Sequence, residues 1–147
     1  MQELIVKIFS IYLAGITGLY KGVPLGFVLK VSPVLTALFT ALGSVTIVLT
    51  IFFSGEPFKK WIIKRYGKKN VEKKSSLFSR IMKKYGMAGL GIIAPGLIGP
   101  ILSMILGIIL IKKTKFFLIY LISGIFLWSI ILTTVGYFSI DLLKNFL

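Results

Sequence analysis

The sequence contains no cysteine and no histidine, and its only acidic side chains are Glu3, Glu56, Glu72 and Asp141. Without cysteine and histidine the chain cannot assemble a Cys/His zinc site, a Ser-His-Asp triad or a disulfide. Four carboxylates spread along the chain do not form a local pair for acid-base catalysis. We therefore predict that the protein is not an enzyme and that it needs no cofactor and no metal.

Apolar residues make up 56% of the 147-residue chain, and the mean hydropathy is +0.96. Four apolar stretches, at residues 4–20, 31–55, 85–111 and 116–140, each reach the roughly 17 residues needed to cross a bilayer core. Backbone groups in lipid must pair inside helices, which predicts an all-α, polytopic integral membrane protein with one membrane domain, residues 1–147. The first stretch lacks a basic n-region and a small-residue cleavage site, so we expect it to belong to the mature protein.

Glycine and proline give the two halves of the chain the same plan. In residues 1–55 a broken segment (4–30), in which Gly22-Val23-Pro24-Leu25-Gly26 should interrupt a helix, precedes an intact span (33–55). In residues 85–147 a second broken segment (85–111) precedes a second span (116–140). Broken segments at corresponding positions are typical of transporters built as inverted repeats, which predicts two re-entrant hairpins. Kinked helices that simply cross the membrane are the alternative.

Residues 56–84 carry 11 of the 18 basic side chains, which predicts a cytoplasmic loop. Re-entrant hairpins would add Lys112, Lys113 and Lys115 to the same face, giving 14 basic residues there against four elsewhere, with both termini outside. Four simple crossings would divide the charges 13 to 5, so the charge pattern favours hairpins. The predicted location is a prokaryotic cytoplasmic membrane.

Apolar residues within the basic loop predict two amphipathic helices at the membrane interface: one around Phe58, Trp61, Ile62 and Tyr66, the other around Leu77, Phe78, Ile81, Met82 and Tyr85. The net charge of +14 would attract nucleic acid, but a loop tied to membrane helices meets anionic lipid first, so we expect lipid and no nucleic acid as partner. Fixing the orientation is the simpler role for these charges. The candidates for lipid-headgroup contact are Lys59, Lys60, Lys64, Arg65, Arg80, Lys83 and Lys84.

Non-helical backbone at membrane depth must be buried in protein or line a cavity, so the broken segments supply candidate cargo contacts. These candidates are Lys21, Gly22, Pro24, Gly26, Pro95, Gly96, Gly99 and Pro100. A charge at such depth is costly, which makes Lys21 a candidate for holding a phosphate or carboxylate. In the alternative reading Lys21 snorkels at a helix end beside Tyr20, and the glycines serve close packing.

The order of the glycine and proline motifs over residues 21–137 resembles that of the small multi-drug export family, which is distantly related to the DedA membrane proteins and their lipid-scramblase relatives. The matching motifs are Gly22-Val23-Pro24-Leu25-Gly26, Thr36-Ala37-Leu38, Ala41-Leu42-Gly43, Gly55-Glu56-Pro57, Tyr85-Gly86, Gly89-Leu90-Gly91, Ala94-Pro95, Gly99-Pro100, Leu106-Gly107, Gly124 with Trp128, and Gly136-Tyr137. The DedA pattern also has an acidic residue near the first hairpin tip and an arginine before the second proline. Residues 18–22 (Gly-Leu-Tyr-Lys-Gly) and 91–95 (Gly-Ile-Ile-Ala-Pro) contain neither.

The resemblance implies efflux of small compounds or movement of phospholipids or lipid-linked phosphates. The sequence thus predicts a small transporter or lipid translocase for an amphipathic or anionic cargo. The rival is a structural or assembly subunit that recruits partners or anionic lipid through its basic loop. Small residues allow close helix approach, which favours a homo-oligomer such as a dimer.

Overall fold

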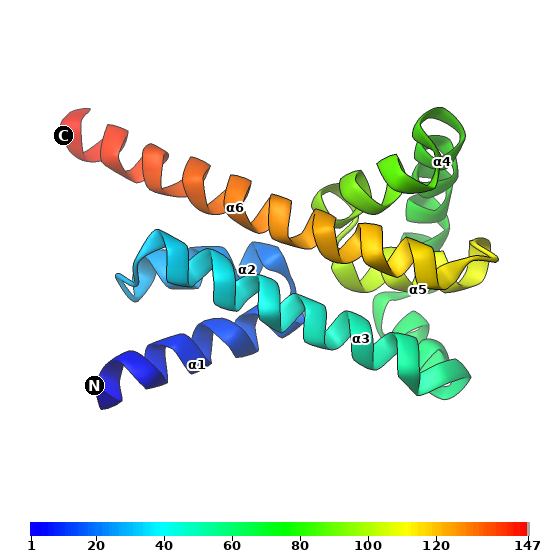
Figure 1. The fold of residues 1–147 in the computed structure, drawn as a ribbon, viewed down its shortest axis with the longest axis horizontal. Helices are drawn as coiled ribbons and strands as arrows, with labels where there is room; N and C mark the ends of the chain where they lie inside the picture. Colours follow the sequence, from blue (N-terminus) through cyan, green and yellow to red (C-terminus); the bar gives the residue numbers. More distant parts are fainter. Residues whose placement is uncertain (147) are drawn as a thin grey trace. The chain divides into compact units, whose positions relative to one another are not determined.

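A computed structural model describes residues 1–146, apart from the side chains at positions 55, 58, 59, 62, 63, 66, 68, 70 and 71. Over this range the chain forms six helices and no strand, which confirms the predicted all-α class (Figure 1). The helices are α1 (Gln2–Thr17), α2 (Leu19–Val28), α3 (Pro33–Tyr66), α4 (Lys68–Leu97), α5 (Pro100–Leu110) and α6 (Thr114–Phe146).

The chain divides into two compact units. Unit 1 comprises Met1–Val45 and Phe126–Leu147, and unit 2 comprises Thr46–Ile125. The long helices α3 and α6 each contribute residues to both units.

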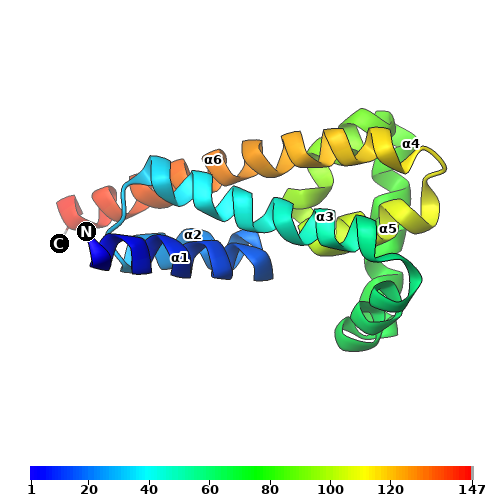
Figure 2. The same ribbon diagram turned by 60° about the horizontal axis from the view of Figure 1, so that its bottom comes forward.

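In unit 1, α1 and α2 form a helical hairpin and lie side by side (Figures 1 and 2). The turn lies at Gly18, whose φ of 140° is rarely adopted by residues with a side chain. The prediction that residues 22–26 break the helix is therefore wrong, because α2 continues through them with Pro24 inside. Pro24 costs α2 only the hydrogen bond to the Tyr20 carbonyl, whereas the backbone at Gly18 cannot continue a helix.

In unit 2, glycines with positive φ mark the turns: Gly67 (78°), Gly86 (70°) and Gly99 (98°). Gly86 divides α4 into a basic N-terminal part and an apolar part from Met87 onward that forms a hairpin with α5. Pro57 lies inside α3 and Pro95 lies inside α4. The break in the second hairpin therefore falls at Gly99 and not at Pro95.

The basic segment differs from the predicted pair of interfacial helices. Helix α3 runs without a break from the predicted span to Tyr66, and Trp61 on this extension is 53% exposed; the side chains of Phe58, Ile62 and Tyr66 lie outside the described residues. The second predicted run is a helix, but Phe78 and Ile81 are buried in the core. The ring of Phe78 packs edge-on against Phe117 of α6, with 5.9 Å between ring centroids.

One register relates the two hairpins and the helices that follow them. Helices α2 and α5 begin 81 residues apart, at Leu19 and Pro100, and so do α3 and α6, at Pro33 and Thr114. Five pairs of glycines share the same separation: Gly15 and Gly96, Gly18 and Gly99, Gly26 and Gly107, Gly43 and Gly124, and Gly55 and Gly136. The plan of hairpin followed by long helix thus occurs twice, at matching positions.

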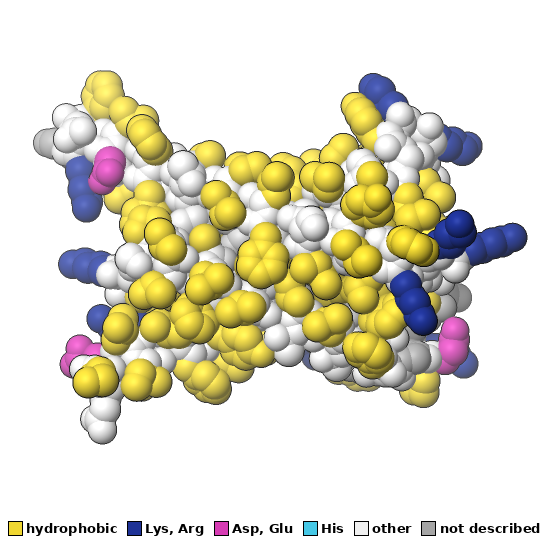
Figure 3. All heavy atoms as spheres, viewed as in Figure 1, with side chains coloured by type: hydrophobic (Ala, Val, Ile, Leu, Met, Phe, Trp, Pro, Cys, Tyr) yellow, Lys and Arg dark blue, Asp and Glu magenta, His cyan; other side chains and the backbone are white. Residues whose placement is uncertain are grey.

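Two helical segments, Pro33–Ser54 and Thr114–Phe146, are long and apolar enough to cross a membrane. Their most apolar windows are only 39% and 33% buried, whereas the central helix of a soluble protein is mostly buried. Large apolar side chains such as Phe116, Ile119 and Phe138 are more than 60% exposed, and Figure 3 shows hydrophobic side chains over much of the face it views. Such extensive apolar exposure is typical of contact with lipid or with another protein.

Candidate functional site

Gly22 and Gly26 lie on the face of α2 that packs against α3. A Cβ atom added at Gly22 would lie 2.6 Å from Cγ2 of Thr40, and one added at Gly26 would lie 2.2 Å from Cγ2 of Thr36. Carbon atoms normally approach to about 3.5–4.0 Å. These two cargo candidates therefore serve close packing of the hairpin against α3.

Lys21 and Pro24 are both exposed, in contrast to Gly22 and Gly26. Lys21 occupies the first turn of α2, and its backbone N–H donates to the Gly18 carbonyl at 3.2 Å. Of the four candidates on the first hairpin, Lys21 is thus the charged and accessible one. It follows the turn at Gly18 by three residues, whereas the sequence predicts the break on its other side, at residues 22–26.

The interface between the α1–α2 hairpin and α3 contains hydroxyl groups that the sequence analysis missed. Thr36, Thr40 and Ser44 recur every fourth residue, so they share one face of α3, and all three are fully buried. Ser44 Oγ donates to the Gly15 carbonyl at 2.8 Å, whereas neither Thr36 Oγ1 nor Thr40 Oγ1 has a hydrogen-bond partner. The sequence signal that could have predicted this buried polar face is the recurrence of hydroxyl residues at four-residue intervals in an apolar span.

The four candidates on the second hairpin belong to unit 2. Pro95, Gly96 and Pro100 are buried, and Gly99 forms the turn between α4 and α5. The amino group of Lys74 donates to the carbonyl of Ile98 beside this turn, with an N–O distance of 3.4 Å. The sequence analysis did not single out Lys74, which here satisfies a carbonyl at the C-terminal end of α4.

Six of the seven lipid-headgroup candidates are exposed: Lys60, Lys64, Arg65, Arg80, Lys83 and Lys84. The side chain of the seventh, Lys59, lies outside the described residues. The Arg65 guanidinium carbon lies 5.5 Å from the Trp61 ring centroid, and the Lys84 amino group lies 5.4 Å from that of Tyr85. Exposed aromatic rings paired with cations are typical of the headgroup level of a membrane.

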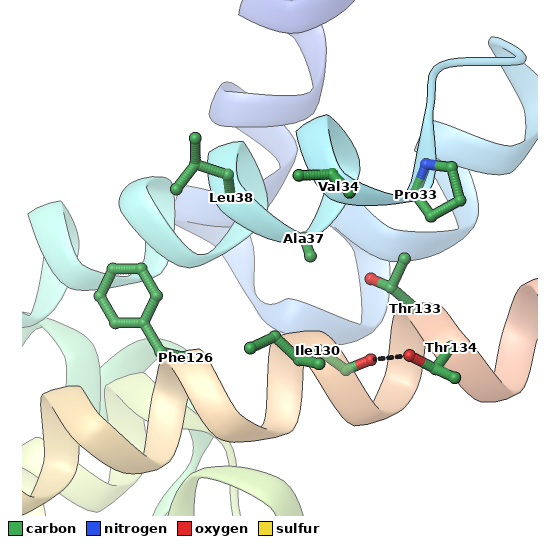
Figure 4. A pocket seen from close by; sticks show the side chains of 8 residues that line it. All are labelled: Pro33, Val34, Ala37, Leu38, Phe126, Ile130, Thr133 and Thr134. Carbon is green, nitrogen blue, oxygen red and sulfur yellow. Dashed lines mark hydrogen bonds between the residues drawn. The ribbon is translucent and has the colours of Figure 1, made fainter.

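Unit 1 contains two cavities that the sequence did not predict. The first, which we call the apolar groove, has a volume of about 380 Å³ between α3 and α6 (Figure 4). It is lined by Pro33, Val34, Ala37, Leu38, Phe126, Ile130, Thr133 and Thr134. Thr134 Oγ1 donates to the Ile130 carbonyl at 2.8 Å, whereas Thr133 Oγ1 is buried without a partner.

The second cavity, which we call the charged mouth, has a volume of about 650 Å³. Its lining is Phe27, Lys30, Val31, Ser32, Pro33, Tyr137, Ile140, Asp141 and Lys144. Tyr137 donates its hydroxyl hydrogen to the Val31 carbonyl and packs edge-on against Phe27, with 4.7 Å between ring centroids. Pro33 lines both cavities, so the charged mouth adjoins the apolar groove.

The backbone at Lys30 is unusual. Its N–H donates to the Phe27 carbonyl and that of Val31 donates to the Gly26 carbonyl, each at 3.1 Å, a Schellman motif that ends α2. Lys30 occupies the left-handed position of this motif with φ 55°, where glycine is favoured. A residue with a side chain costs roughly 1–2 kcal/mol in this conformation.

Among the residues that the structure describes, no group of three or more acidic, histidine or cysteine side chains could hold a metal ion. The apolar groove and the charged mouth are lined by apolar side chains, hydroxyl groups and lysines. These groups have the chemistry to contact an amphipathic or anionic molecule. Comparison with protein-family models, with curated proteins and with solved structures finds no match.

Proposed function

We propose that the protein is an integral membrane transporter or lipid translocase that moves an amphipathic or anionic cargo. Two re-entrant hairpins, arranged as an inverted repeat, would provide the path. The observation that carries the proposal is the pair of short helical hairpins, each followed by a helix long enough to cross.

The second arm of each hairpin is too short to reach the opposite membrane face. Helix α2 has 10 residues and α5 has 11, which correspond to about 15 and 17 Å at 1.5 Å per residue. The hydrocarbon core is about 30 Å thick. An apolar hairpin with such an arm enters lipid and returns to the face from which it came.

Contacts with the following helix indicate how deep each hairpin reaches. A Cβ at Gly43, ten residues into α3, would lie 2.2 Å from the Tyr12 carbonyl oxygen, and one at Gly124, ten residues into α6, would lie 2.4 Å from that of Gly91. Ten helical residues span about 15 Å, which is half the hydrocarbon thickness. Both hairpin turns would then lie near the middle of the bilayer.

The hairpins would enter from opposite faces. Within unit 1 the start of α3 pairs with the C-terminal half of α6, as shown by the 2.7 Å hydrogen bond from Ser129 Oγ to the Ala37 carbonyl. Because α6 is one unbroken helix, its start at Thr114 would lie on the other face. This topology is the one that the charge pattern favours, with residues 56–84 and 112–115 together on the cytoplasmic side.

Lys21 beside the first turn is the best-placed side chain to meet an anionic cargo. A cation in a re-entrant hairpin is expensive unless it has a function, which supports a role in binding phosphate or carboxylate. The family resemblance supports the same class of activity. The rival function, a structural subunit without transport, requires neither hairpin turns at this depth nor Lys21.

Reconstitution in liposomes tests the proposal. We expect the purified chain to accelerate the flipping of a fluorescently labelled phospholipid, measured by quenching from outside, or the uptake of a cationic dye. Lys21→Met should slow the flipping of an anionic phospholipid about tenfold, which corresponds to about 1.4 kcal/mol of lost cargo binding. Lys7→Met in α1 is the control and should retain activity.

Normal activity of Lys21→Met at equal reconstitution would refute the anion-binding role. Absence of both lipid flipping and dye uptake, together with recovery of the chain in a stoichiometric complex, would favour the structural subunit.

A further inference from the structure

Lys30 occupies a backbone conformation in which glycine would be more stable. Residues held in disfavoured conformations point to a function of their side chain. Lys30 contributes to the lining of the charged mouth, together with Lys144 and Asp141. In the described part of the chain, neither lysine forms an ion pair with Asp141.

The charged mouth is therefore suited to an anion. It contains two lysines against one carboxylate, and the hydroxyls of Ser32 and Tyr137 also line it. The Tyr137 hydroxyl hydrogen is engaged by Val31, so Ser32 and the two lysines are the donors available to a ligand.

The adjoining apolar groove differs from the charged mouth because its lining, among the described residues, contains no charged side chain. Apart from two threonines, the side chains that line it are hydrocarbon or aromatic, and Figure 4 shows that they come from α3 and α6. Thr133 offers a buried hydroxyl without a partner. A positively charged cavity that adjoins an apolar one matches a ligand with an anionic head and a hydrocarbon tail.

We propose that the charged mouth and the apolar groove together bind one anionic phospholipid. Its phosphate lies between Lys30 and Lys144, and one acyl chain lies along Val34, Leu38 and Ile130. Each part of this lipid contacts a surface of matching chemistry, because the lysines bind the phosphate and the apolar side chains pack against the acyl chain. The inference rests on the proposed function, since it names the cargo class and gives it a site on the face where α3 begins.

Lipid binding to the full-length chain in detergent tests the inference, with fluorescent phosphatidylglycerol as the probe. We expect phosphatidylglycerol to bind at least about tenfold more tightly than phosphatidylcholine, which corresponds to about 1.4 kcal/mol. Lys144→Gln and Lys30→Gly should each weaken its binding by about tenfold, whereas Lys7→Gln should not.

Lys30→Gly separates a binding role from a structural one. Glycine relieves the left-handed backbone, so this variant should unfold about 3 °C higher than the native chain while it loses affinity. Unchanged affinity for phosphatidylglycerol in Lys30→Gly, or equal binding of the two lipids by the native chain, would overturn the site.

The acyl chain is tested by filling the groove. Val34, which lines the groove, and Val28, which does not, are 76% and 75% exposed, so Val34→Trp and Val28→Trp form a matched pair. Val34→Trp should weaken lipid binding about tenfold and Val28→Trp should not. Inorganic phosphate should compete at least about a hundredfold more weakly than the lipid; equal competition would show a free-anion site instead.

The binding test and the flipping test can fail separately. Specific binding of phosphatidylglycerol without lipid flipping would support this binding site and would refute the proposed translocase function. If lipid flipping is unchanged in the Lys30 and Lys144 variants and does not depend on headgroup charge, this binding site is refuted, but the proposed translocase function is not.

Discussion

Gly43→Ala and Gly124→Ala are each expected to destabilise the folded protein by about 3 kcal/mol, at the upper end of the usual cost of overpacking. The added methyl group would meet backbone atoms in both cases: the Tyr12 carbonyl oxygen at 2.2 Å for Gly43, and the Gly91 carbonyl oxygen at 2.4 Å for Gly124. Backbone atoms inside helices cannot rotate away as a flexible side chain can. The hairpin must therefore move off the long helix.

Reversible unfolding in mixed micelles measures this effect. Ser123→Ala, next to Gly124, is the control because Ser123 is exposed and its hydroxyl donates only to Ile119 of the same helix, at 3.1 Å. We expect the control to stay within about 0.5 kcal/mol of the native chain. Equal stability of Gly43→Ala and Gly124→Ala to the native chain would contradict the close contacts and the shared register of the two halves.

Phe117→Ala should have a comparably large effect, about 3–5 kcal/mol, which is the usual range for truncating a buried phenylalanine. Phe117 is 0% exposed, packs against Phe78, and occupies the space that a side chain at Gly107 would take. Its loss would leave a cavity in the core of unit 2 and would release the basic part of α4 from α6.

The adjacent residue provides the matched control, since Phe116 is 61% exposed. Phe116→Ala removes the same group from the surface, so we expect a cost below about 1 kcal/mol. Protease sensitivity of residues 68–85, measured alongside unfolding, should rise in Phe117→Ala alone. Similar behaviour of the two variants would show that Phe117 does not hold the basic helix in place.

The long helices were predictable because their signal is strong and local. An apolar run from Pro33 to Ser54 leaves few alternatives to a helix, and the second long run begins at Thr114, close to its predicted start. The first hairpin turn was misplaced because proline was weighted as heavily as glycine. Pro24 and Pro95 each forfeit one hydrogen bond inside a helix, whereas the positive φ at Gly18 and Gly99 ends one.

The candidate site was only partly predictable. Lys21 lies near a turn, but that turn is at Gly18 and not at residues 22–26. The role of Gly22 depends on which side chain faces it, and that is fixed by the packing of α2 on α3. The apolar groove and the charged mouth combine residues about a hundred positions apart, such as Val31 and Tyr137. A single sequence contains no signal for such a pairing. The one local signal is that the hydroxyl side chains of Ser129 and Thr133 are four residues apart and therefore share one face of α6.

The central claim is that both hairpins return to the face from which they enter, and cysteine accessibility tests it most directly because the native chain has no cysteine. Single cysteines replacing Gln2, Ser32, Glu72 and Lys113, all exposed, would be labelled in sealed vesicles with a reagent that does not cross the membrane. We predict that Gln2→Cys and Ser32→Cys label from one side, and Glu72→Cys and Lys113→Cys from the other. Labelling of Gln2→Cys and Ser32→Cys from opposite sides, or of Glu72→Cys and Lys113→Cys from opposite sides, would contradict the account.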